Sequence, residues 1–283
     1  MPELPEVETM RRDLASSLRG ATVGAVRLHH DDILLDGDPP GRFAAAVAGR
    51  RIDAVERRGK NLVLRLGPDG RVLQSQVRMT GRFAMANPDD PGGHGLRAAL
   101  GLTHVAAEFD LSDGRTLLYD DVRRLGGFRL QSAEEWARRE AELGPEPLDP
   151  DFRAADLAAG LGAGRAPVKN ALLDQRRIAG VGNIYASEAL FRARIEPRRA
   201  CGELQADDHR RLHRALRAVL REALRGEGTS LRDYRMVDGG TGTFQDRLRV
   251  YDREGLPCPR CGAPVGRIVQ AGRSTFYCPA CQA

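Results

Sequence analysis

Two cysteine pairs, Cys258-Pro259-Arg260-Cys261 and Cys278-Pro279-Ala280-Cys281, are separated by 16 residues in the last part of this 283-residue sequence. Each pair can chelate a metal ion from one tight turn, and four thiolates complete the tetrahedral shell of a structural zinc site. Four protein ligands leave no coordination position open, so the metal is expected to stabilise structure without taking part in chemistry. The spacing therefore predicts a ribbon that holds one Zn²⁺ through all four cysteines.

Upstream of the cysteines, the sequence predicts helices. Apolar residues recur at helical spacing over 166–178, 183–191 and 206–225, and the glycine turn Ala179-Gly180-Val181-Gly182 joins the first two of these stretches. Asn183 is expected to cap the second helix, because its side chain can accept a hydrogen bond from a free N–H group. Free amides at a helix start also suit a phosphate, so this pair is typical of helices that present their turn to a nucleic-acid backbone.

The N-terminal half predicts one helix followed by strands. The helix is expected over 5–18, and alternating apolar residues predict strands over 21–28, 51–66, 71–77, 103–111 and 115–119. We therefore expect an α+β protein. Its parts are an antiparallel β-sandwich with a leading helix over 1–132, a linker over 133–150, a helical domain with a long loop over 151–247, and the zinc ribbon over 248–283.

The charge balance indicates a polyanionic partner, since the net charge is +5 and the pI is near 9.2. Only two of the basic residues are lysines, Lys60 and Lys169. In a sequence so biased toward arginine, both are candidates for positions that need a compact ammonium group. No apolar run approaches the roughly 20 residues of a membrane span, so a cytoplasmic protein without a membrane partner is expected.

The start of the sequence, Met1-Pro2-Glu3, carries a candidate nucleophile. Removal of Met1 would leave Pro2 as a secondary amine, and because α-amino groups titrate near pH ~7.7–8.0, part of it would be uncharged in the cell. An amine beside a carboxyl group is the minimal requirement for Schiff-base chemistry at a sugar or carbonyl carbon. The alternative is that Pro2 and Pro5 only stiffen the start of the first helix.

Four motifs together resemble the bacterial formamidopyrimidine-DNA glycosylase and endonuclease VIII family: Met1–Glu8, Arg58-Gly59-Lys60, Gly180–Glu188 and the cysteine ribbon. They occur in the family's order and extend from Pro2 to Cys281. The resemblance implies a bifunctional base-excision repair enzyme that flips a damaged nucleotide out of double-stranded DNA. It also implies a Schiff base followed by β- and δ-elimination, without an organic cofactor, in a monomer associated with the bacterial nucleoid.

The same resemblance implies a role for each matching residue. Pro2 is the nucleophile at C1′, and Glu3 protonates the sugar ring oxygen, which needs a carboxyl group kept neutral by its surroundings. Lys60 matches the lysine assigned to proton donation in β-elimination, and Arg273 matches the ribbon arginine assigned to δ-elimination and phosphate binding. Further matches to family positions that contact DNA or lie near the site are His104, Arg165, Lys169, Asn183 and Glu6.

Met79, Arg123 and Leu125 match the three side chains that fill the space left by the flipped nucleotide, and Arg123 would face the orphaned base and favour cytosine. The sequence departs from the family here. Gln76-Val77-Arg78 replaces His-Leu-Gly, and Val122 and Leu125 replace proline and phenylalanine. Leucine stacks less well than an aromatic ring, so these changes bear on lesion scanning and opposite-base preference.

The segment from Thr229 to Phe244 resembles the loop that closes over 8-oxoguanine in the formamidopyrimidine branch. Together with Arg123 it favours oxidised purines (8-oxoguanine and formamidopyrimidines) as substrates, with oxidised pyrimidines as the alternative. A DNA-binding protein without catalysis stays open as a second reading, although Pro2, Glu3 and Lys60 are all present. A third reading is a tautomerase that uses an N-terminal proline as a general base. The zinc ribbon and the phosphate-type turn argue against this reading.

Overall fold

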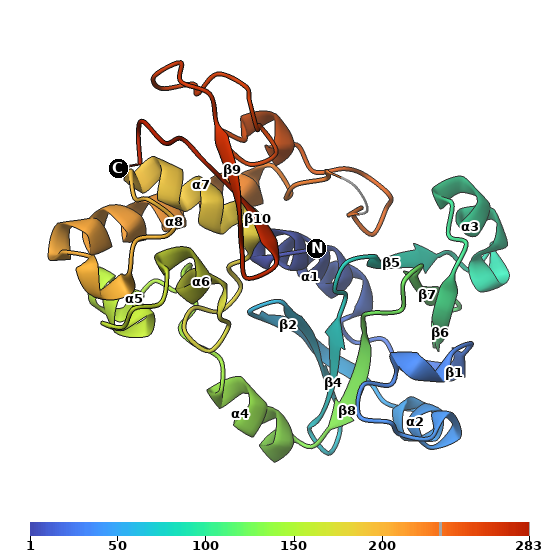
Figure 1. Ribbon diagram of the computed structural model, residues 1–283. Coiled ribbons are helices and arrows are strands. Elements are labelled where there is room, and N and C mark those ends of the chain that lie inside the picture. The colour runs from blue at the N-terminus through green and yellow to red at the C-terminus, as the bar shows by residue number, and fades with distance from the viewer. Residues whose placement is uncertain (232–233, 283) are drawn as a thin grey trace. The chain divides into compact units, whose positions relative to one another are not determined.

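The computed structural model describes residues 1–231 and 234–282, and the chain divides into two compact units (Figure 1). Unit 1 comprises Met1–Pro2, Glu6–Glu140 and Glu227–Gly242, and unit 2 comprises Glu3–Pro5, Ala141–Gly226 and Thr243–Ala283. Within the expected lesion loop, Arg232 and Asp233 lie outside the described residues, as does Ala283 of the expected ribbon. None of the helices in the described residues combines the length and the apolar character that a bilayer crossing needs.

Unit 1 contains two four-stranded antiparallel sheets, in the orders β1-β6-β7-β5 and β2-β3-β4-β8. The strands are β1 (Val23–Leu28), β2 (Ile52–Arg58), β3 (Asn61–Leu66), β4 (Arg71–Gln76), β5 (Gly81–Ala86), β6 (Val105–Leu111), β7 (Thr116–Asp121) and β8 (Gly127–Gln131). The expected β-sandwich is therefore confirmed. The strand expected over 51–66 is two strands, because Gly59, at φ +59°, turns the chain back on itself.

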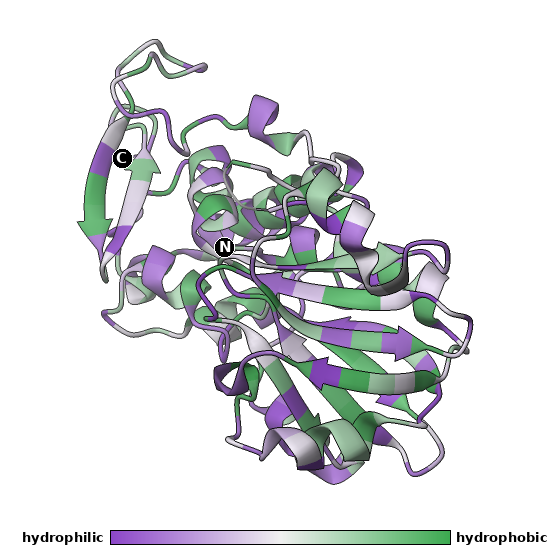
Figure 2. Ribbon diagram, turned by 90° about the vertical axis from the view of Figure 1, so that its right-hand side faces the viewer, coloured by the Kyte–Doolittle hydropathy of each residue, from purple (hydrophilic) through white to green (hydrophobic). Residues whose placement is uncertain are grey.

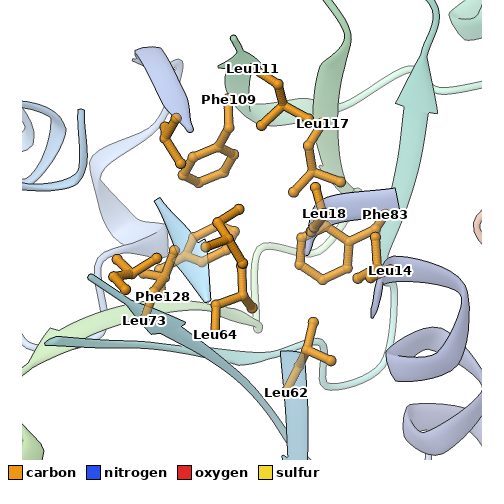
Figure 3. Close-up of a pocket in the computed structure, with 13 residues that line it drawn as sticks. Leu14, Leu18, Leu62, Leu64, Leu73, Phe83, Phe109, Leu111, Leu117 and Phe128 are labelled. Carbon is orange, nitrogen blue, oxygen red and sulfur yellow. The ribbon is translucent and has the colours of Figure 1, made fainter. Parts of the chain in front are cut away.

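The interior of unit 1 is closed and apolar. Hydrophobic and hydrophilic residues are interleaved along its strands (Figure 2), and the ring of Phe128 lies 4.9–6.3 Å from those of Phe43, Phe83, Phe109 and Tyr119. The cavity among these side chains holds about 10 Å³ and is lined only by apolar residues (Figure 3). A single water needs about that volume and polar partners as well, so this cavity is too small and too apolar to hold one.

Helices surround the sheets of unit 1. Helix α1 (Leu4–Leu18) buries Val7, Met10, Leu14 and Leu18 at helical spacing, as predicted. Helices α2 (Pro40–Val47), α3 (His94–Leu100) and α4 (Ala133–Ala141) and the 3-10 turns η1 (Asp31–Ile33) and η2 (Pro91–Gly93) were not predicted. Helix α4 lies within the expected linker, where its Trp136 packs against Val63 and Val72.

Unit 2 contains a group of helices and a two-stranded hairpin. Its elements are α5 (Ala154–Leu161), α6 (Val168–Leu173), α7 (Asn183–Ala193), η3 (Cys201–Glu203), α8 (Ala206–Arg225), η4 (Phe244–Arg247), β9 (Gly266–Gln270) and β10 (Arg273–Tyr277). The helices predicted over 183–191 and 206–225 are α7 and α8. The prediction over 166–178 was too long, because the Asp174 carboxylate accepts the N–H of Arg176 and favours a turn after Leu173.

Candidate active site

Glu3 lies at the start of helix α7. Its side chain is buried, and its carboxylate accepts hydrogen bonds from the N–H groups of Ile184 at 2.9 Å and Tyr185 at 3.4 Å. These are the free amides that the sequence suggested for a phosphate, so the protein's own carboxylate occupies that position. The expected cap was also wrong: Gly182 is the N-cap residue and Asn183 is the first residue of the helix.

The two glycines before α7 make room for the N-terminal residues. A Cβ at Gly182 would lie 2.3 Å from Cδ of Glu3, although the φ of −131° at Gly182 would suit any residue. A Cβ at Gly180 would lie 2.7 Å from Cδ1 of Leu4, whose N–H donates to the Gly180 carbonyl at 3.0 Å. The Gly-x-Gly pattern therefore serves close packing against the segment that carries Glu3.

Lys169 is fully buried beside this carboxylate. Its ammonium donates to Oδ1 of Asn183 at 2.6 Å, to the Ser274 carbonyl at 3.3 Å and to Oγ1 of Thr275 at 2.5 Å. Burial lowers the pKa of Lys169 to about 8; the Glu3 carboxylate opposes this shift and the Arg273 guanidinium adds to it. Three hydrogen bonds, two of them short, thus hold an ammonium group whose pKa lies below that of an ordinary lysine.

Asn183 links this lysine to the hairpin. Its Nδ2 donates to the Ser274 carbonyl at 2.8 Å, while its Oδ1 accepts from Lys169. Arg273, the first residue of β10, is exposed next to Ser274, and the tip before it turns through Ala271 and Gly272, which both have positive φ. Unit 2 thus brings Glu3, Lys169, Asn183 and Arg273 together, whereas Arg165 is exposed in the bend before α6.

Unit 1 holds the other expected catalytic residues. Pro2 is buried two residues before α1, and Lys60 is half-buried in the two-residue turn between β2 and β3. Glu6 is buried, and its carboxylate accepts the N–H of Thr229 at 2.8 Å. The hydroxyl of Tyr234 lies 3.5 Å from the Glu6 carbonyl. Glu6 therefore contacts the expected lesion loop at two residues, Thr229 and Tyr234.

The three expected wedge residues are exposed on two loops of unit 1. Met79 is 38% exposed and Leu125 46% exposed, which is unusual for large apolar side chains. Nη1 of Arg123 lies 3.2 Å from Sδ of Met79, and the Arg123 N–H donates to Oγ1 of Thr80 at 3.2 Å. The loops thus present an arginine between apolar tips.

Sequence reasoning missed the residue that shapes the second wedge loop. The Asp121 carboxylate is fully buried and accepts hydrogen bonds from the N–H of Gly126 at 2.9 Å and the hydroxyl of Tyr119 at 3.2 Å. The sequence signal that could have identified Asp121 is its position directly before Val122 and Arg123. His104 immediately precedes β6, and its N–H donates to Oδ1 of Asp120 at 2.6 Å.

The four cysteines of the ribbon fit one zinc ion. Their Sγ atoms all lie within 4.8 Å of one another, with Cys258 4.0 Å from Cys281 and Cys261 3.5 Å from Cys278. A tetrahedron with Zn–S bonds of about 2.3 Å has S–S edges of about 3.8 Å. Four thiolates at these separations confirm the predicted structural zinc site. The remaining cysteine, Cys201, is buried, and burial raises the pKa of its thiol.

Comparison with known proteins agrees with this arrangement. Family models match residues 1–128 (formamidopyrimidine-DNA glycosylase N-terminal domain), 143–235 (formamidopyrimidine-DNA glycosylase H2TH domain) and 255–283 (zinc finger found in FPG and IleRS). The formamidopyrimidine-DNA glycosylase of Chloroflexus aggregans is 47% identical over 100% of this chain and 98% of its own length.

Two solved structures are similar over nearly the whole chain. The MutM (FPG) protein of Thermus thermophilus has a TM-score of 0.85 at 42% identity, covering 99% of this chain and 98% of that one. A Lactococcus lactis FPG mutant, solved with DNA that contains Fapy-dG, has a TM-score of 0.88 at 32% identity and covers 99% of both chains. With matches of this extent in sequence and in structure, the chain belongs to the formamidopyrimidine-DNA glycosylase family.

Proposed function

We propose that this protein is a bifunctional DNA glycosylase and abasic-site lyase that excises oxidised purines from double-stranded DNA. The observation that carries the proposal is the position of Glu3: the residue bonded directly to Pro2 has its carboxylate fixed at the start of α7, next to Lys169 and Asn183. An amine nucleophile is therefore followed by an oriented acid, and the neighbouring cations, Lys169 and Arg273, suit a DNA backbone.

The proposed reaction begins after removal of Met1. The Pro2 nitrogen attacks C1′ of a flipped nucleotide, the bond from C1′ to the base breaks, and the base leaves with that electron pair and with the proton that the Pro2 nitrogen gives up. Glu3, in its protonated form, gives its proton to the sugar ring oxygen as the bond from C1′ to that oxygen breaks and the iminium ion forms. The iminium acidifies C2′, so loss of the C2′ proton expels the 3′ phosphate. Lys60 is the proposed proton donor in this first elimination. A second elimination expels the 5′ phosphate, with Arg273 as the proposed phosphate ligand.

The proposed DNA contacts fall into two groups. Arg165, His104 and Asn183 would hold phosphates, which position the duplex without reading its sequence, and Lys169 would add its positive charge from its buried position. Met79, Arg123 and Leu125 would enter the space that the flipped nucleotide leaves, and their exposure supports this assignment, since apolar side chains kept in water favour insertion between base steps. Zn²⁺ would stabilise the ribbon that carries Arg273, held by its four thiolates.

The proposed substrate preference rests on the segment anchored by Glu6. Relatives do not decide it alone, since Lactococcus lactis Fpg was solved with DNA containing Fapy-dG, an abasic site or an oxidised pyrimidine. The Glu6–Thr229 hydrogen bond gives this segment a fixed base from which to cover a flipped purine. We place the enzyme as a monomer in the bacterial cytoplasm, associated with the nucleoid.

Borohydride trapping tests this proposal. Reduction of a mixture of the protein and a duplex with 8-oxoguanine opposite cytosine should give a covalent adduct, and mass spectrometry should locate it on Pro2. Pro2→Gly should weaken base excision, and Lys60→Arg should not restore full activity. The absence of any adduct would leave a DNA-binding protein without catalysis. Faster cleavage of thymine glycol than of 8-oxoguanine would assign the enzyme to oxidised pyrimidines.

A further inference from the structure

Arg57 joins two parts of unit 1 that carry proposed catalytic groups. It lies near the end of β2, and its side chain is only 11% exposed. Its Nε donates to the Glu8 carboxylate of α1 at 3.2 Å, and its Nη1 donates to the Gly59 carbonyl at 2.9 Å. Glu8 follows Pro2 by six residues, and Gly59 immediately precedes Lys60. One guanidinium group thus connects the helix after the nucleophile to the turn with the lysine.

Contacts from β3 and β4 hold the Lys60 turn on its other side. Nδ2 of Asn61 donates to the Arg58 carbonyl at 3.0 Å, and Oδ1 of Asn61 accepts from the side-chain amides of Gln74 and Gln76, both at 2.8 Å. The turn itself is a two-residue hairpin loop closed by the Arg58–Asn61 pair. The amide group fixes the turn on the strand side, and the Arg57 side chain links the turn to α1.

Glu8 is a well-defined partner for this contact. Its carboxylate also accepts from Arg11 at 2.9 and 3.0 Å and from Arg12 at 3.0 Å. Burial acts to raise the pKa of Glu8, but hydrogen bonds and charge from Arg11, Arg12 and Arg57 outweigh it and hold the pKa below the usual value. The carboxylate is therefore charged throughout the neutral range, and it is held from its own helix as well as by Arg57.

We propose that Arg57 is a positioning residue that sets the place of Lys60 relative to the nucleophile's helix. The proposal rests on the roles proposed above for Pro2 and Lys60. Arginine is required because two different N–H groups of one planar fork serve two acceptors, whereas the single ammonium of a lysine cannot reproduce that geometry. A misplacement of about 1 Å in a reacting group can cost on the order of 100-fold in rate.

The test uses the full-length, zinc-loaded protein and a duplex with a preformed abasic site, on which β-elimination is measured in single turnovers. Arg57→Gln and Arg57→Lys should each slow β-elimination by about 10- to 100-fold, with duplex affinity unchanged. Glu8→Gln should slow it too, and the double variant Glu8→Gln/Arg57→Gln should be no slower than Arg57→Gln alone. Arg12→Gln is the matched control: it removes an exposed arginine from the same carboxylate, and β-elimination should keep its rate.

Three outcomes separate the possible failures. If Lys60→Ala abolishes β-elimination while both Arg57 variants keep the wild-type rate, the positioning role is refuted and the proposed function stands. If Lys60→Ala keeps the wild-type rate, the proposed role of Lys60 fails first. If the Arg57 variants melt at lower temperature but react at the wild-type rate per folded molecule, Arg57 is only structural and the proposal is refuted. If Arg57→Gln does not fold, the β-elimination rate of Arg57→Lys decides between the two roles.

Discussion

Gly182→Ala is expected to disable base excision through a single added methyl group. The new Cβ would lie 2.3 Å from Cδ of Glu3, so the carboxylate must move by about 1 Å to restore a carbon–carbon contact of about 3.5 Å. Glu3 is buried at the start of α7, and a shift of its carboxylate would weaken its hydrogen bonds to Ile184 and Tyr185. A displacement of that size should slow base excision by about 100-fold, or roughly 2.7 kcal/mol of activation free energy.

The assay is single-turnover excision of 8-oxoguanine opposite cytosine, followed together with thermal unfolding. The backbone at Gly182 has an ordinary φ, so the substitution introduces no backbone strain of its own. Gly41→Ala is the matched control, because it adds the same methyl group where nothing lies within 4 Å. An excision rate for Gly182→Ala within twofold of the wild type would refute the idea that α7 fixes the acid.

Three further outcomes are expected. Because burial lowers the pKa of Lys169 to about 8, its ammonium loses the proton as pH rises through that value. The affinity for an abasic-site duplex, measured by fluorescence anisotropy, should therefore fall about 10-fold from pH 7 to 9. If the affinity of Lys169→Met fell with pH as steeply as that of the wild type, this prediction would be contradicted. Metal analysis should find one zinc per chain, and Cys258→Ser should release it and weaken DNA binding; a fully active, metal-free variant would argue against a structural role. Arg123→Ala should equalise cleavage opposite the four bases while changing the free energy of unfolding by less than about 0.5 kcal/mol, since Arg123 is exposed; a retained preference for cytosine would place that readout elsewhere.

The local features of this fold were predictable from sequence, and the non-local ones were not. The 3.6-residue period of apolar residues predicts helices α1, α7 and α8, and the cysteine spacing predicts the zinc site. Strands β5 and β8 were missed, although Asn87-Pro88 follows the first and Gly126-Gly127 stands at the start of the second. The end of α6 was missed because one aspartate, Asp174, outweighs a continuing apolar pattern.

In the candidate site, too, the local features were predictable from sequence and the non-local ones were not. The chemistry-bearing residues could be proposed from motifs, since each motif is contiguous in the chain. Their partners could not: the bond from Ile184 to Glu3 spans 181 residues, and Arg57 reaches Glu8 across 49. Only the folded chain reveals that the helix start suggested for a phosphate holds a carboxylate instead, because that outcome depends on where the N-terminal residues run.

The burial of Lys169 gives this protein an unusual response to amine-directed reagents. The chain has two lysines, and one of them exposes none of its surface. The amines left for acylating probes are the half-buried Lys60 and the N-terminal amine, which removal of the exposed Met1 would place on Pro2, and these are the groups proposed to carry the chemistry. Covalent labelling of the native enzyme would report on its reacting amines with almost no background, and protection by an abasic-site duplex would map them without any mutation.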